Sequence, residues 1–199
     1  ALHKNSRIKA NNDLISASLI LPSTLLHQKG QSQDYTGEKG ESGISTVLRR
    51  MDLLGWDFDP AEEQEYVKQA RIILFQFPLY WYSFPAIIKN WVEKVFSHGF
   101  AYGSTGHALD GKHLLLSFTV GGSADHYPKN GQNRHEIEDF LYIFEQMAAL
   151  CRMKYEQPVY SFGTAYIPGF STEEDRKRVL DTADRHAQRL LERLKEPES

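Results

Sequence analysis

The stretch that decides the fold is residues 70–103, with the sequence ARIILFQFPLYWYSFPAIIKNWVEKVFSHGFAYG. Residues 72–77 form an apolar run rich in β-branched and aromatic side chains, which is typical of a strand buried on both faces of a parallel sheet. After Pro85, a residue that suits the first turn of a helix, apolar residues recur at helical spacing from Ile87 to Phe96. The stretch therefore predicts a strand, a loop and a helix in succession.

The loop of this stretch lies where the predicted strand ends, and it is dominated by aromatic side chains. In open α/β sheets the ligand pocket lies beyond the carboxyl ends of the strands. Aromatic rings at that edge can stack on a planar ring, and backbone N–H groups can bond to its heteroatoms. Packing of the rings against a neighbouring loop is the alternative interpretation. The candidate cofactor-binding residues here are Pro78, Leu79, Tyr80, Trp81 and Tyr82.

A second apolar run, residues 112–120, predicts another buried strand, and it ends in two glycines. Glycine lets the backbone approach a ligand closely, and the successive N–H groups of such a turn can bind negative charge. A plain glycine turn is the alternative. The candidate residues of this loop are Thr119, Val120, Gly121 and Gly122. A third strand is expected at residues 158–163, followed by a last helix that a capping box of Ser171 and Glu174 begins.

Two blocks of this sequence, FQFPLYWYSFPAIIKNWVEKVFSHGFAYG and GHALDGKHLLLSFTVGG, resemble hallmark segments of the flavodoxin-like NAD(P)H:quinone oxidoreductases. That family also contains the small flavoproteins ancillary to bacterial potassium efflux systems. Val120 stands in place of the second threonine of the family's flavin loop. The resemblance covers residues 57–195 and implies an α/β, flavodoxin-like fold. We expect a doubly wound, parallel five-stranded sheet with helices on both faces, in a single flavin-binding domain over residues 1–199.

The resemblance also implies an activity and its cofactors. FMN is the expected cofactor, with FAD as the alternative, and NAD(P)H is the electron-donating substrate. Hydride would pass from NAD(P)H to flavin N5 and then to a quinone or similar acceptor in a ping-pong reaction. Tyr127 matches a family tyrosine near the acceptor and is the candidate catalytic residue, with a pocket wall as the alternative. The family's partner histidine is not clearly matched, and His126 and His135 are further candidate proton sources.

A helix is expected at residues 139–151, with apolar residues over most of its circumference. We expect the protein to associate with another molecule through this helix. Such a surface indicates a homodimer, which the resemblance also implies. A regulatory flavoprotein that binds a membrane potassium efflux transporter is the alternative to an enzyme. A one-electron carrier is a second alternative, which the net charge of only −3 disfavours.

Residues 1–55 leave two interpretations open. In the first, residues 2–8 form the phosphate loop, with Ser6 and Ile8 as cofactor-binding residues. Only Ala1 precedes this loop in the sequence, so the strand that should lead into it is missing. In the second, residues 14–21 supply a central strand and Pro22–Thr24 form the phosphate loop. Residues 43–54 have a helical periodicity, and we expect a helix there.

Composition sets the broad class of the protein. A chain of 199 residues with 41% hydrophobic residues is enough for one sizeable core. Lys and Arg number 23 against 26 Asp and Glu, which gives no reason to expect nucleic acid. The histidines show no metal-binding spacing, and Cys151 falls in an apolar pattern that indicates a buried thiol. Because no apolar run is long enough for a membrane span and no cleavage site follows residues 14–21, we expect a cytoplasmic protein.

Overall fold

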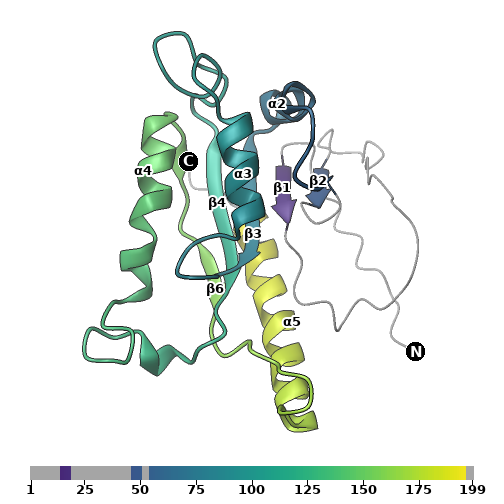
Figure 1. Cartoon of the computed structure of the whole chain (residues 1–199), viewed down its shortest axis with the longest axis vertical. Coiled ribbons are helices and arrows are strands. Elements are labelled where there is room, and N and C mark those ends of the chain that lie inside the picture. The colour runs from purple at the N-terminus through teal and green to yellow at the C-terminus, as the bar shows by residue number, and fades with distance from the viewer. Residues whose placement is uncertain (1–13, 19–45, 51–53, 196–199) are drawn as a thin grey trace.

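The structure, a computed structural model, describes residues 14–18, 46–50 and 54–195 as a parallel sheet with helices on both faces (Figure 1). The strands are β1 (Leu14–Ser18), β2 (Thr46–Arg50), β3 (Ile72–Pro78), β4 (His113–Thr119), β5 (Lys154–Tyr155) and β6 (Val159–Ser161). The helices are α2 (Pro60–Gln69), α3 (Ala86–Val95), α4 (Tyr142–Leu150) and α5 (Glu173–Lys195), with short 3-10 helices η1 (Ala124–His126) and η2 (Ile137–Phe140).

The strand order is β2-β1-β3-β4-β5, with β6 also paired to β4, and every pair is parallel. β5 pairs with the first two residues of β4, and β6 pairs with the last three. β5 and β6 therefore share one position in the sheet, which has six strands but is five strands wide. Pro158 separates β5 from β6 and has no N–H to donate to a ladder. The order is that of a flavodoxin-like doubly wound sheet, which confirms the predicted fold class.

The position of β1 bears on the two interpretations of residues 1–55. β1 is central, between β2 and β3, so the interpretation that residues 14–21 supply a central strand is the one that the structure shows. Ser6 and Ile8 precede this strand in the sequence, and both they and Pro22–Thr24 lie outside the described residues. The helix expected at residues 43–54 is wrong, because Thr46–Arg50 pairs as β2 with all five residues of β1. Short apolar patterns fit either period, and pairing partners decide between them.

The two faces of the sheet carry different side chains of the same strands. Ile73, Phe75 and Phe77 of β3 point into the larger core, together with Leu114, Leu116 and Phe118 of β4. Alternate residues of the same strands, including Ile72, Leu74 and Leu115, contact Leu190 of α5 on the opposite face. α2 and α3 contact each other on the first face, and α5 lies behind the sheet (Figure 1). This alternation is what a strand buried on both faces requires.

Helix ends depart slightly from the sequence expectations. The capping box of α5 is Thr172 with Asp175, one residue after the expected pair of Ser171 and Glu174. The Asp175 N–H donates to Thr172 Oγ1 at 3.1 Å, and the Thr172 N–H donates to Asp175 Oδ2 at 3.0 Å. This backbone hydrogen bond, with those from Arg178 and the Thr172 hydroxyl, lowers the pKa of Asp175 to about 2. Ser171 instead accepts from the Ile167 N–H.

Cys151 is buried at the end of α4, as expected, and burial raises the pKa of its thiol. The thiolate is therefore disfavoured there. Within the described residues, no helix is long and apolar enough to cross a membrane.

A buried histidine joins α5 to the sheet. His186 Nε2 lies 2.8 Å from Ser117 Oγ of β4, and His186 Nδ1 lies 2.9 Å from Ser161 Oγ of β6. The imidazole is only 6% exposed, and burial, with a smaller contribution from Arg189, lowers its pKa to about 4. The ring is therefore neutral at pH 7 and acts as a crosslink between three elements.

His186 predicts a loss of stability in mild acid. Its folded pKa is below the unfolded value of about 6.5, so the unfolded chain binds the proton more readily. The stability contribution is constant above pH 6.5 and falls as the pH drops towards 4. We expect the free energy of unfolding, measured with urea, to fall between pH 7.5 and pH 4.5. This fall should be about 2–3 kcal/mol larger in the native chain than in His186→Gln. His107→Gln, at an exposed histidine, is the control. If both variants reduced the pH dependence of the unfolding free energy equally, His186 would not be its source.

Candidate functional site

The aromatic loop at the end of β3 is a tight four-residue turn. Tyr80 and Ser83 exchange two backbone hydrogen bonds, each 3.0 Å long. The two central residues, Trp81 and Tyr82, have positive φ of 51° and 62°. The Trp81 side chain is 93% exposed, so the turn extends the ring away from the protein at the carboxyl edge of the sheet.

This turn is strained, and Tyr82 holds it in place. Left-handed backbone at a non-glycine residue costs about 1–3 kcal/mol, and it persists only where surrounding contacts fix it. The Tyr82 ring stacks on Phe140 at 4.8 Å between centroids, with 24° between the planes. Its hydroxyl donates to Asn133 Oδ1 at 3.2 Å. Contacts from residues far along the chain therefore fix the conformation that points Trp81 outward.

The loop after β4 lies beside this turn. Pro78 is in register with Thr119, and the Leu79 N–H donates to the Thr119 carbonyl oxygen at 2.8 Å. Val120 is 1% exposed, its N–H donates to the Ser161 carbonyl, and its own carbonyl accepts from Thr164. The structure thus brings the two predicted sets of residues to one edge, but Val120 has no polar group left for a ligand.

The residues next to Val120 do have unused donors. Within the described residues, the N–H groups of Trp81, Tyr82, Gly121 and Gly122 have no acceptor. Neither glycine has a positive φ, and a Cβ on either would meet only ordinary contacts of 3.5 Å or more. Backbone conformation and crowding therefore do not require glycine here. Close approach of a ligand to the bare backbone is a physical reason for both glycines.

Tyr127, the candidate catalytic residue, is 8% exposed and lies against Phe162, with the ring centroids 5.2 Å apart. Burial, with a smaller effect of Tyr82, raises the pKa of its hydroxyl above the usual value of 10. The hydroxyl is therefore protonated at neutral pH. It has no hydrogen-bond partner within the described residues, so it is available to a ligand as a proton donor.

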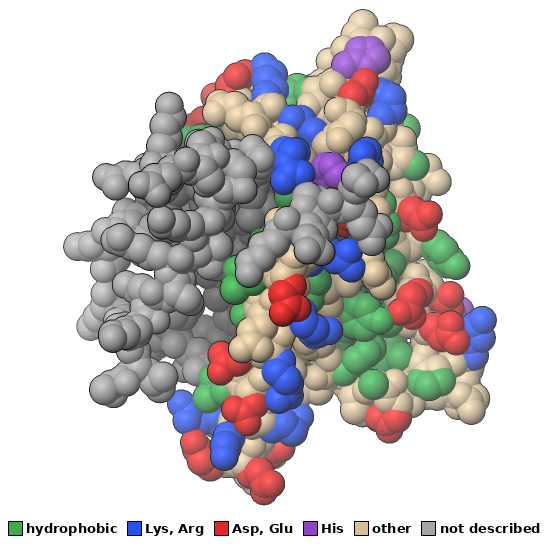
Figure 2. Space-filling view, turned by 180° about the vertical axis from the view of Figure 1, so that it is seen from behind, with side chains coloured by type: hydrophobic (Ala, Val, Ile, Leu, Met, Phe, Trp, Pro, Cys, Tyr) green, Lys and Arg blue, Asp and Glu red, His purple; other side chains and the backbone are tan. Residues whose placement is uncertain are grey.

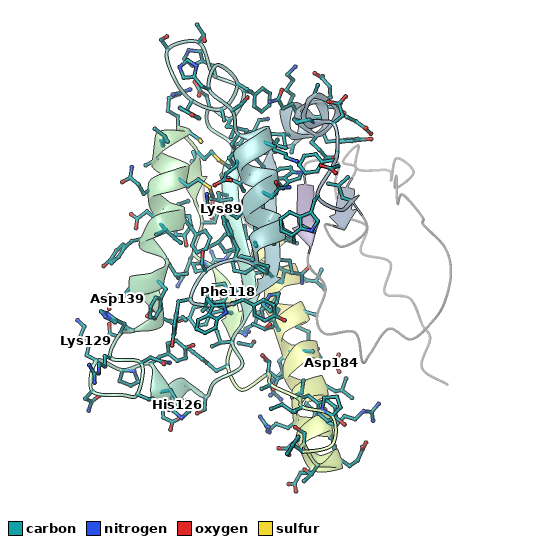
Figure 3. The ribbon with its side chains drawn as sticks, viewed as in Figure 1. Lys89, Phe118, His126, Lys129, Asp139 and Asp184 are labelled. Carbon is teal, nitrogen blue, oxygen red and sulfur yellow. The ribbon has the colours of Figure 1, made fainter. Side chains whose placement is uncertain are left out.

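The two candidate histidines have different surroundings. His126 Nδ1 lies 3.5 Å from the position that a Cβ on Gly122 would take, so this ring borders the glycine loop. His135 Nδ1 lies 3.2 Å from Asp139 Oδ2, and its ring contacts Phe140. Figure 3 shows His126 and Lys129 on the loop below β4 and Asp139 where the chain turns towards α4. In the part of the chain that is described, no group of His, Cys, Asp or Glu could hold a metal ion.

Sequence reasoning missed the residues that support this site. Asn133, Phe140 and Phe162 contact Tyr82 and Tyr127, yet neither Asn133 nor Phe140 is at the end of a predicted strand. Phe162 had a positional signal, because it lies near the end of the third strand predicted at residues 158–163. Asn133 had none, because its partner is 51 positions away in the chain.

The geometry suits a planar ligand with a polar edge. An exposed aromatic side chain on a fixed turn and four unused backbone donors lie at the carboxyl edge of a parallel sheet. Donors fixed before a ligand arrives stabilise negative charge on it without reorganisation. An aromatic side chain and unused N–H donors at one edge fit the planar, heteroatom-bearing ring of the implied flavin.

Comparison with known proteins supports the flavodoxin-like fold. General stress protein 14 of Bacillus subtilis (strain 168) is 37% identical over 123 residues, covering 62% of this chain and 70% of that protein. The glutathione-regulated potassium-efflux system ancillary protein KefG of Yersinia pestis (strain Pestoides F) is 36% identical over 139 residues, covering 70% of each. The crystal structure of general stress protein 14 of Treponema denticola in complex with FMN has a TM-score of 0.65 and 26% identity. It covers 75% of this chain and 82% of that one.

A sequence profile of the family described as "Flavodoxin-like fold" matches residues 36–189. This match spans more than half of the chain and agrees with the strand order of the sheet. The chain therefore belongs to the flavodoxin-like fold family, and its relatives include KefG and general stress protein 14.

Proposed function

We propose that this protein is an FMN-dependent oxidoreductase that transfers electrons from NAD(P)H to a quinone or similar acceptor. The observation that carries the proposal is the set of four unused backbone N–H groups, two in the Trp81 turn and two in the glycine loop after β4. The FMN complex of the Treponema denticola relative supports FMN over FAD.

The cofactor site is proposed at the edge formed by Pro78–Tyr82 and Thr119–Gly122. Bound flavin supplies reversible two-electron chemistry, in which its N5 accepts and returns a hydride. The chain's own part is to bind and orient: the Trp81 side chain would flank a bound flavin, and the N–H groups of Gly121 and Gly122 would donate to it. We place the phosphate loop at Pro22–Thr24, because these residues follow the carboxyl end of β1 in the sequence.

Tyr127 is proposed to hold the proton that the acceptor needs. Its hydroxyl stays protonated because burial raises the pKa, and the Phe162 ring fixes its orientation. Asn133 is engaged in a hydrogen bond with Tyr82, and His135 is engaged with Asp139. His126 is therefore the second candidate for proton delivery.

We further propose a homodimer through α4. Tyr142, Ile143 and Leu150 of this helix are 65%, 54% and 56% exposed, while Phe144 and Ala148 face the core. Apolar side chains on the outer face of a helix that also packs inward indicate an association surface. α4 follows the loop that carries Tyr127, so a second subunit there would lie near the site.

A regulatory role is the second candidate function. The similarity to KefG, whose name describes an ancillary protein of a potassium-efflux system, is the observation that favours it. A transporter-binding role leaves the flavin site in place and adds a membrane partner. Turnover with NAD(P)H and an acceptor in the absence of any transporter favours the enzyme.

The first test of the proposal is flavin content and reduction. The purified protein should bind one FMN per chain, and NADPH or NADH should bleach it rapidly under anaerobic conditions. A quinone should then restore the colour in a separate step, because donor and acceptor use the same site in turn. Failure to take up added FMN or FAD would exclude the flavin site, and binding without bleaching would favour the regulatory role.

Trp81→Gly tests the turn. Glycine adopts positive φ without cost, so the fold should be retained while the ring is lost. We expect the FMN dissociation constant, measured by fluorescence titration, to rise about tenfold, or ~1.4 kcal/mol. Trp56→Ala removes a half-exposed tryptophan outside this site and should leave the dissociation constant unchanged. Equal FMN affinity in both variants would mean that the Trp81 ring does not contact the cofactor.

Ile143→Glu tests the association surface. The native chain should sediment as a dimer at micromolar concentration, and a charge at Ile143 should shift it to a monomer because the carboxylate would be desolvated at the interface. Lys177→Glu places the same side chain at an exposed position of α5 and should remain dimeric. A native monomer would overturn the proposed dimer.

A further inference from the structure

A groove lies away from the proposed cofactor site, between α5 and the outer edge of β6. This groove has a volume of about 630 Å³. It is lined by Tyr160, Ser161, Phe162, Thr182, Arg185, Gln188, Arg189 and Glu192. In the view from behind, Lys and Arg side chains alternate with Asp and Glu side chains along α5, next to a hydrophobic area (Figure 2). The two arginines of the lining face one carboxylate, so the groove is positively charged.

Arg189 is fixed in this groove before any ligand arrives. Its guanidinium donates to the Tyr160 carbonyl oxygen and to Ser161 Oγ, both at 2.7 Å. Ser161 is in turn bonded to the buried His186, which is neutral at pH 7. The positive charge of the groove therefore comes from arginine and does not depend on the histidine.

Arg185 lies one helical turn before Arg189 on the same face of α5. Its guanidinium donates to Thr182 Oγ1 at 3.0 Å and, in the described part of the chain, forms no ion pair. A guanidinium keeps its charge at every physiological pH and binds phosphate through two parallel N–H donors. Arg185 is thus a candidate phosphate ligand, with Glu192 as the carboxylate of the same groove lining and Asp181 one helical turn before it.

The groove is connected to the cofactor edge by direct contacts. Phe162, which lines the groove, lies against Tyr127, and the Gly163 N–H donates to the Gly122 carbonyl at 2.8 Å. Phe162 therefore borders both the groove and the Tyr127 ring, so a long substrate bound at one can extend towards the other. Among the substrates of the proposed function, only the dinucleotide is long and carries phosphate.

We propose that this groove binds the 2′-phosphate of NADPH through Arg185, with Arg189 as a fixed second cation, and so makes the protein prefer NADPH to NADH. This inference rests on the proposed function, because it assigns the donor of that reaction. Thr182 and Gln188 supply neutral hydrogen-bonding groups for the adjoining sugar.

The test compares adenosine 2′,5′-bisphosphate with adenosine 5′-monophosphate by titration calorimetry on the purified protein. The bisphosphate should bind at least tenfold more tightly, and Arg185→Ala should remove that difference while Arg185→Lys keeps part of it. Arg176→Ala is the matched control, since this arginine of the same helix pairs with Glu173 outside the groove. A second readout is the ratio of kcat/KM for NADPH to that for NADH, which should fall about tenfold in Arg185→Ala.

The outcomes separate this inference from the proposed function. Equal affinity for the two nucleotides, or equal losses in Arg185→Ala and Arg176→Ala, would overturn the phosphate site even if NADPH still bleaches the flavin. Arg185-dependent binding of the bisphosphate by a protein that takes up no flavin would retain the phosphate site and reject the proposed oxidoreductase.

Discussion

The register between β3 and β4 is the constraint on which the candidate site depends. Phe77 and Phe118 are in register, and their rings stack with centroids 5.7 Å apart and 18° between the planes. A slip of one residue would turn these rings to the other face of the sheet, where α5 leaves no equivalent core. Core packing therefore fixes the register, and the register brings the ends of both strands, Pro78 and Thr119, to one level. The position of the ligand edge follows from burial far from any ligand.

The Trp81 turn shows how the site uses this rigid base. Two successive left-handed residues are unfavourable, and the aromatic contacts of Tyr82 offset that cost within the folded protein. A glycine turn would be less strained, but it would present no ring. The strain is therefore the consequence of placing an indole and two unused N–H groups at the same edge. The contacts of Tyr82 with Phe140 and Asn133 stabilise this strained turn.

The sequence was sufficient for the central part of this fold because its signals there are local. Residues 72–77 and 112–120 are apolar runs bounded by Pro or Gly, and both are strands. The helix expected at residues 43–54 failed because β2 is defined by its pairing with β1, a contact that no local period contains. The same reasoning applies to the site. Trp81 and Gly121 stand at predicted strand ends, whereas Asn133 acts only through a hydrogen bond to a residue 51 positions away.

The two outer sides of the molecule differ in a way that constrains how it can associate. α4 exposes Tyr142 and Ile143, which lose little on desolvation, whereas α5 exposes Arg185 and Arg189 beside the outer edge of β6. Burying those guanidinium groups against an apolar surface would remove water from two cations without a paired carboxylate for each. Association through α4 avoids that cost and leaves the arginine groove open to solvent. A dimer built on α4 and a substrate groove on α5 are therefore compatible, because each uses the surface whose solvation suits it.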